Sequence, residues 1–168
     1  MNSNPSYPHR KNLRLPDFDY SLPGIYFVTI VTQDRKLLFG KVVDGETVLN
    51  EVGLMVKEVI DQIPEHYPRI HIEVFVIMPN HVHILFHISE VVAGPRACHS
   101  NKTMTGQPQG VDPTKNHLSL PEIVHRIKSL STNRYILGVK DKNWPRFENR
   151  LWQRNYYEHI IRNERDYQ

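Results

Sequence analysis

The alternation of apolar and polar residues predicts four β-strands. Residues 24–33, GIYFVTIVTQ, are rich in β-branched and aromatic residues and predict the first strand. Residues 69–78, RIHIEVFVIM, and residues 81–88, HVHILFHI, predict two strands joined at Pro79–Asn80. Residues 151–162, LWQRNYYEHIIR, predict a fourth strand. The middle two strands are close enough along the chain to form a hairpin.

The apolar residues between the first two strands have the spacing of an α-helix. Asn50 is a suitable N-cap, and the region of Pro64 and Pro68 should end the helix. The apolar positions repeat at the spacing of one helical face. These positions are Val52, Met55, Val56, Val59, Ile60 and Ile63.

A second helix is predicted over residues 119–138. Ser119 and Glu122 form a capping-box pattern at its start, and Gly138 is a suitable stop. A further helix is expected from Asn163, of which the printed chain contains barely one turn. The buried stripe of the second helix should consist of Leu120, Ile123, Val124, Ile127 and Leu130.

The order of these elements predicts an α+β fold. Strand, helix, two strands, helix and strand is the ferredoxin-like β-α-β-β-α-β order, with one antiparallel sheet and its helices on one face. The best match of apolar faces in the hairpin sets Ile77 opposite His81 after a three-residue connection. In that register Ile70, Ile72, Val74 and Val76 share the core face with Val82, Ile84, Phe86 and Ile88. The opposite face then carries His81, His83 and His87, with His71 and Glu73 nearby.

Composition fits one globular domain spanning residues 1–168. Residues 1–23 should form an N-terminal arm without a signal peptide, and residues 89–118 a long flexible loop. Cys98 is the one cysteine, which excludes an internal disulfide and fits a reducing cytoplasm. No apolar run is long enough to suggest a membrane span.

The formal charge of +3 is unevenly distributed. Residues 126–165 contain ten Lys or Arg against four Asp or Glu, which favours a face that binds a polyanion. A solvated surface with scattered charges is the alternative. Six residues are predicted to bind DNA: Arg126, Lys128, Arg134, Arg150, Arg154 and Arg162.

His81 and His83 are candidate metal ligands. Residues two apart on a strand point to the same side, about 7 Å apart at their Cα atoms. Two imidazoles there can converge on one divalent ion if a third ligand comes from elsewhere. An exposed pair without a metal is the alternative.

The stretch MPNHVHILF, residues 78–86, resembles the His–hydrophobe–His signature of the HUH single-strand DNA transposases. Together with PGIYFVTIVTQDRKLLFG, LPEIVHRIKS and LWQRNYYEHIIRNERDY, it is most similar to the REP-associated tyrosine transposases. The resemblance implies that His81 and His83 bind Mg²⁺ or Mn²⁺ at a scissile phosphate of single-stranded, hairpin-forming DNA. It further implies a tyrosine nucleophile and a 5′-phosphotyrosine intermediate. Monomer and homodimer both remain open.

The resemblance implies a nucleophile beyond the printed sequence. The matching tyrosine falls about six residues after Tyr167, so Tyr167 would point some 120° away on the helix. Tyr167 is therefore a poor substitute. We expect residues 1–168 to bind DNA without cleaving it, so enzyme activity of this chain stays an open question.

Two other function classes remain. A non-catalytic single-stranded nucleic-acid-binding module would stack bases on Tyr156, Tyr157 and Phe75. A small metallohydrolase would use His71 and Glu73 together with the histidine pair, although no extended metal motif supports it.

Overall fold

The computed structural model describes residues 18–90, 118–163 and 166. The predicted arm and long loop, and the helix expected from Asn163, fall largely outside these residues. The strands are β1 (Gly24–Val31), β2 (Gly40–Val43), β3 (Glu46–Leu49), β4 (Ile70–Met78), β5 (His81–Ile88) and β6 (Tyr157–Ile161). The helices are α1 (Glu51–Asp61), α2 (Ile63–His66) and α3 (Leu120–Asp141), with a 3-10 turn at Gln33–Arg35.

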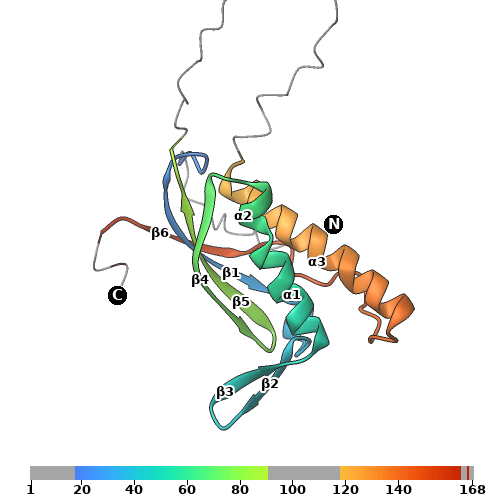
Figure 1. Cartoon of the computed structure of the whole chain (residues 1–168). Helices are drawn as coiled ribbons and strands as arrows, with labels where there is room; N and C mark the ends of the chain where they lie inside the picture. Colours follow the sequence, from blue (N-terminus) through green and yellow to red (C-terminus); the bar gives the residue numbers. More distant parts are fainter. Residues whose placement is uncertain (1–17, 91–117, 164–165, 167–168) are drawn as a thin grey trace, which may run out of the picture.

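Four strands form one antiparallel sheet in the order β4-β5-β1-β6. The helices α1 and α3 cover one face of this sheet (Figure 1). With the β2–β3 hairpin and the short α2 set aside, the order β1-α1-β4-β5-α3-β6 confirms the predicted α+β, ferredoxin-like arrangement. Strand β5 lies inside the sheet, between β4 and β1.

The core lies between the sheet and the helices. Apolar residues of β1 and β5, such as Val28 and Ile84, pack with Ile60 of α1 and Ile127 of α3. All four are at most 1% exposed. Burial of this shared face holds β5 in a fixed register, because a one-residue slip would turn its apolar side chains to solvent.

Helix α1 starts as predicted, since the backbone N–H of Gly53 donates to Oδ1 of Asn50. It ends at Asp61, and the short α2 with Pro64 follows. In α3 the backbone N–H and hydroxyl of Ser119 both donate to the Glu122 carboxylate. The predicted capping box is present.

Helix α3 differs from the prediction at two positions. It continues through Gly138 to Asp141, and the Trp144 ring packs against the helix at Gly138. Leu130 is 40% exposed and does not belong to the buried stripe, which continues instead through Ser131 and Tyr135.

The predicted register of the β4–β5 hairpin was wrong by one residue. Ile77 lies opposite Val82 and Met78 opposite His81, so the connection is the two residues Pro79 and Asn80. A bulge between Ile72 and Val74 exchanges the faces of β4. Val74 and Val76 are therefore exposed on the histidine face, at 56% and 49%.

Two further parts of the structure differ from the prediction. The β2–β3 hairpin was not predicted, and it projects away from the sheet (Figure 1). Its turn residues Asp44 and Gly45 both have positive φ, as a tight hairpin requires. Strand β6 is shorter than the predicted 151–162, and only a single bridge joins Trp152 to Thr32 before it.

Candidate functional site: a histidine pair on the open face of the sheet

The histidine pair lies on the face of β5 that carries no helix. Val82, between the two histidines, is 1% exposed and points into the core, whereas His81 and His83 are half-buried on the other side. His87 shares their face, as predicted, and lies beside His71 and Glu73 at the far end of the hairpin.

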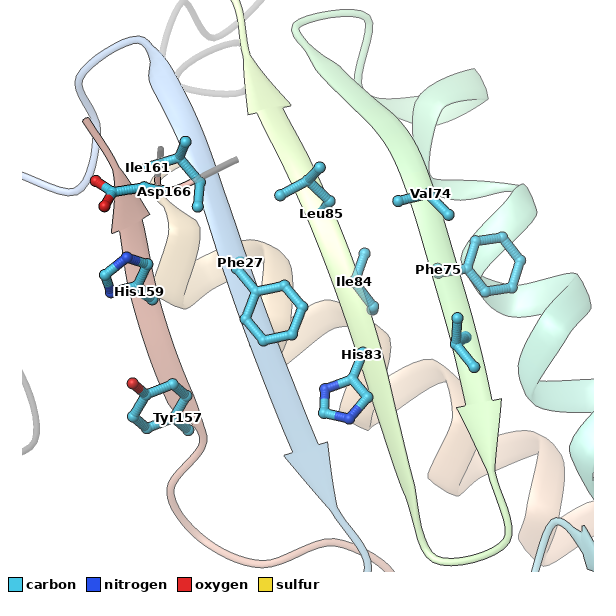
Figure 2. Close-up of a pocket in the computed structure, with 11 residues that line it drawn as sticks. Phe27, Val74, Phe75, His83, Ile84, Leu85, Tyr157, His159, Ile161 and Asp166 are labelled. Atoms are coloured by element: carbon cyan, nitrogen blue, oxygen red, sulfur yellow. The ribbon is translucent and has the colours of Figure 1, made fainter. Parts of the chain in front are cut away.

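The two imidazoles meet edge to face. Their Nε2 atoms are 3.0 Å apart, and the ring planes make an angle of 82°. Each Nδ1 has its own oxygen partner: Asn80 Oδ1 lies 2.6 Å from His81 Nδ1, and Thr29 Oγ1 lies 2.9 Å from His83 Nδ1. Phe27 stacks on the His83 ring at a centroid distance of 5.3 Å, which fixes its orientation (Figure 2).

The hydrogen bonds set the tautomer of His81. Asn80 donates through Nδ2 to the Arg35 carbonyl oxygen, so its Oδ1 is the atom that faces His81. His81 Nδ1 must then donate, which leaves the lone pair on Nε2 directed at His83. The Thr29 hydroxyl can donate or accept and so supports either tautomer of His83.

Both imidazoles are held in the neutral form near pH 7. Burial lowers the pKa of His81, and the positive charge of Arg35 lowers it further. Burial also lowers the pKa of His83, with His81 as the second cause. Neutral imidazole is the form that binds a metal ion.

The pair fits one edge of a metal-coordination sphere. Two nitrogen ligands at about 2.1 Å from one ion and at a right angle lie about 3.0 Å apart. Among residues 18–90, 118–163 and 166, no group of three His, Cys, Asp or Glu side chains is arranged to hold an ion. A third ligand would therefore come from an amide, a water molecule, a substrate oxygen or another part of the chain.

The residues of the metallohydrolase alternative are not brought together. His71 lies opposite His87, whereas His81 lies opposite Met78 at the other end of the hairpin. Glu73 pairs with His87, at 3.5 Å between Oε1 and Nδ1. The structure therefore separates His71 and Glu73 from the pair.

The six predicted DNA-binding residues do not form one surface. Arg126, Lys128 and Arg134 lie on α3, on the opposite side of the sheet from the histidines (Figure 1). Arg134 bonds to Gln62 at 2.6 Å and lies 3.6 Å from the Glu58 carboxylate of α1. Lys128 points into the fold, where its ammonium contacts three backbone carbonyls.

The other three arginines lie outside α3, at two separate hollows. Arg150 and Arg154 border a polar concavity of about 780 Å³ together with Gln33. Arg162 lines a smaller hollow with Glu158 at the β6 edge. No sequence motif indicated Gln33, whose place in the concavity depends on contacts between distant segments.

An apolar groove adjoins the histidine pair on the same face. Phe27, Leu85 and Val74 line its floor, and Tyr157 and His159 of β6 line its side (Figure 2). Tyr157 is 56% exposed. The other two predicted stacking residues lie on the helix side of the sheet. The Phe75 ring contacts Lys57 of α1, and the Tyr156 ring contacts Lys128 of α3.

Asn163 forms the bond expected of an N-cap, since its Oδ1 accepts from the backbone N–H of Asp166 at 3.1 Å. Tyr167 lies outside the described residues.

No helix in the described ranges has the length and apolar character needed to cross a membrane.

No family model matches the chain. A Haemophilus influenzae protein named "Uncharacterized protein" is 37% identical over 163 residues, which are 95% of this chain and 82% of that protein.

Two solved structures share the fold. A REP-associated tyrosine transposase bound to a REP hairpin superposes with a TM-score of 0.53 at 18% identity. That match covers 94% of this chain, which spans only 66% of the transposase. A candidate transposase of Deinococcus radiodurans gives a TM-score of 0.51 at 16% identity, covering 98% of this chain and 89% of its own. By its identity to the Haemophilus influenzae protein over nearly its whole length, the chain belongs to the same family as that protein.

Proposed function

We propose that this chain is a DNA-binding protein of the HUH transposase type that acts on single-stranded, hairpin-forming DNA. The observation that carries the proposal is the convergence of the His81 and His83 Nε2 atoms, 3.0 Å apart, on the open face of an interior strand. The shared fold with a transposase bound to a REP hairpin supports it.

The two histidines and the residues that contact them have different roles in this function. His81 and His83 would hold Mg²⁺ or Mn²⁺ through Nε2, and imidazole ligands favour Mn²⁺ over Mg²⁺. Asn80 and Thr29 orient the two rings through Nδ1. When bound, the ion would polarise a DNA phosphate. Phe27 shields one face of His83 from solvent.

Strand cleavage requires an attacking hydroxyl in addition to the metal ligands. Tyr157 is exposed on the histidine face, and Thr29 lies between it and His83 in the sheet. Tyr156 is directed toward Lys128 on the helix side. We expect Tyr157 to contact bases, and we expect the nucleophile in the helix that follows Asn163.

A non-catalytic single-stranded nucleic-acid-binding module is the second candidate. The apolar groove with Phe27 and the exposed Tyr157 favours it, because unpaired bases stack on aromatic side chains. Such a module needs no metal. The two functions therefore differ in whether Mn²⁺ changes DNA binding.

The test is fluorescence anisotropy with a labelled single-stranded oligonucleotide that folds into a hairpin with a single-stranded flank. We expect binding that Mn²⁺ strengthens in the native chain but not in a His81→Ala, His83→Ala double variant. A perfect duplex of the same sequence should bind more weakly. Binding unaffected by Mn²⁺ would favour the non-catalytic module, and no preference over the duplex would overturn both.

A further inference from the structure

Lys128 is bound within the fold rather than directed at solvent. Its Nζ lies 2.9 Å from the carbonyl oxygen of Gln153, 3.4 Å from that of Arg154 and 3.0 Å from that of Asn155. An ammonium has three donors, so these carbonyls can satisfy all of them. Burial lowers the pKa of Lys128 to about 8. The ammonium is therefore poorly placed to contact a DNA phosphate.

The segment that Lys128 holds is also attached to α3 and β1 at other points. Trp152 Nε1 donates to the Ser131 hydroxyl at 2.9 Å, one turn after Lys128 on α3. The Gln153 N–H donates to the Val31 carbonyl at 2.9 Å. Residues 151–155 are thus fixed between the helix and the end of β1. The carbonyl oxygens of its last three residues accept hydrogen bonds from Lys128.

The same segment forms one wall of the polar concavity. The carbonyl oxygens of residues 153–155 face Lys128, the same three residues line the concavity, and Arg154 is exposed. Arg150, Asn149 and Gln33 complete the lining. Two guanidinium groups among amide side chains form a donor-rich, positively charged lining of the kind that binds phosphate oxygens.

The concavity lies across the end of β1 from the histidine pair. Val31 lies opposite His81 in the sheet, and Gln33 follows two residues later. The backbone N–H of Thr32 donates at 2.9 Å to the carbonyl of Asn80, whose side chain orients His81. A strand with one phosphate at the histidines could therefore place a neighbouring phosphate in the concavity.

We propose that Lys128 is a positioning residue that holds residues 153–155 so that Arg154, with Arg150 and Gln33, forms a phosphodiester-binding subsite beside the histidine pair. The proposal rests on the proposed function, since the subsite serves the same DNA strand. It replaces the sequence-based prediction that Lys128 itself binds DNA. The side chain of Arg154 is the group through which Lys128 acts.

Amide hydrogen exchange tests the positioning without DNA. We expect faster exchange confined to residues 149–156 in Lys128→Met, and near-native exchange in Lys128→Arg, which keeps a cation and its donors. Lys140→Met, an exposed change on the same helix, is the control and should match the native chain. Native exchange in Lys128→Met would overturn the proposal. If Lys128→Met does not fold, Lys128→Gln takes its place, with the same expected result and the same result that would overturn the proposal.

Hairpin DNA binding then tests the subsite. Arg154→Ala and Lys128→Met should each weaken binding, by about three- to tenfold for the loss of one charge-assisted contact. The double variant should bind as Arg154→Ala alone does, because coupled residues are not additive. Additive losses would mean that Lys128 acts independently of Arg154 and would overturn the proposal. Absence of binding by the native chain would overturn the proposed function and the subsite together, whereas hydrogen exchange would still report on the Lys128 contacts.

Discussion

At the residue scale, the histidine pair depends on neighbours that are not themselves ligands. Asn80 and Thr29 each occupy one Nδ1, and Phe27 stacks on His83. These contacts leave both Nε2 atoms facing each other at 3.0 Å. Because both rings are half-buried and neutral near pH 7, the pair is prepared for an ion before any ion binds.

Replacing either histidine should reduce metal binding without unfolding the protein. We expect His81→Ala and His83→Ala to weaken Mn²⁺ binding by at least tenfold, measured by calorimetric titration, since each removes one of two imidazole ligands. Thermal stability should change by less than about 1 kcal/mol, the usual range for a partly exposed position. His87→Ala, on the same strand and face, is the matched control. Equal loss in all three variants would contradict a site at the pair.

At the element scale, α3 continues past a glycine that normally ends a helix. A Cβ at Gly138 would lie 2.2 Å from Cε3 of Trp144. Trp144 is held by a bond from its Nε1 to the Glu51 carboxylate at 3.0 Å and by the Tyr135 ring. The absence of a side chain at Gly138 lets this connection between α3 and α1 form.

Gly138→Ala should destabilise the protein although alanine is the better helix former. In an open helix the change would add about 1 kcal/mol of stability. Here the added methyl group must displace Trp144, and we expect a net loss of about 1–3 kcal/mol in the free energy of unfolding. Chemical denaturation measures this loss. In a Trp144→Ala background the same change should be neutral or stabilising, and an unchanged loss there would disprove the steric cause.

At the scale of the whole molecule, the sheet separates two surfaces. One face carries α1 and α3 (Figure 1). The other carries the histidine pair and the apolar groove. Arg150 and Arg154 border the concavity next to the pair, whereas Arg126 lies on α3. A DNA strand on the open face would therefore meet only part of the positive charge of residues 126–165.

The salt dependence of hairpin binding should distinguish these arginines. Each phosphate neutralised on a single strand contributes about −0.7 to the slope of log affinity against log salt. We expect Arg154→Met to make the slope shallower by about this amount, and Arg126→Met to leave it unchanged. Binding measured by anisotropy at several NaCl concentrations gives the slopes. A larger effect from Arg126→Met would place the DNA on the helix side.

The polypeptide of residues 1–168 should bind hairpin DNA without forming a covalent adduct. Metal ligands without a positioned nucleophile give little phosphoryl transfer. Labelled hairpin DNA is incubated with the protein and Mn²⁺, and adducts are sought on a denaturing gel. Extending the chain by a helix with Tyr about six residues after Tyr167 should produce an adduct.

Two variants identify an unexpected nucleophile. An adduct from residues 1–168 that is lost in Tyr167→Phe would show that Tyr167 attacks, and that the register inferred for the last helix is wrong. Loss in Tyr157→Phe would assign the reaction to the exposed tyrosine of β6. Either result would replace the expectation that this polypeptide only binds DNA.

The features that the sequence alone determined are local and periodic. Alternation on β5 set the histidines opposite the core, and the helical period and caps defined α1 and the start of α3. These signals suffice because burial of one face selects the direction of every side chain along an element. The order of elements then restricted the fold to a sheet with helices on one face.

Tertiary structure decided the features that depend on contacts between distant segments. The bulge in β4, the packing of Trp144 on Gly138 and the Thr29–His83 contact each join parts of the chain that no local pattern relates. Lys128 shows the difference most directly. In the sequence it is one of several basic residues, but in the fold its ammonium lies against carbonyls 25 to 27 residues away. A side chain's charge is visible in the sequence, whereas the groups that satisfy it are brought together only by folding.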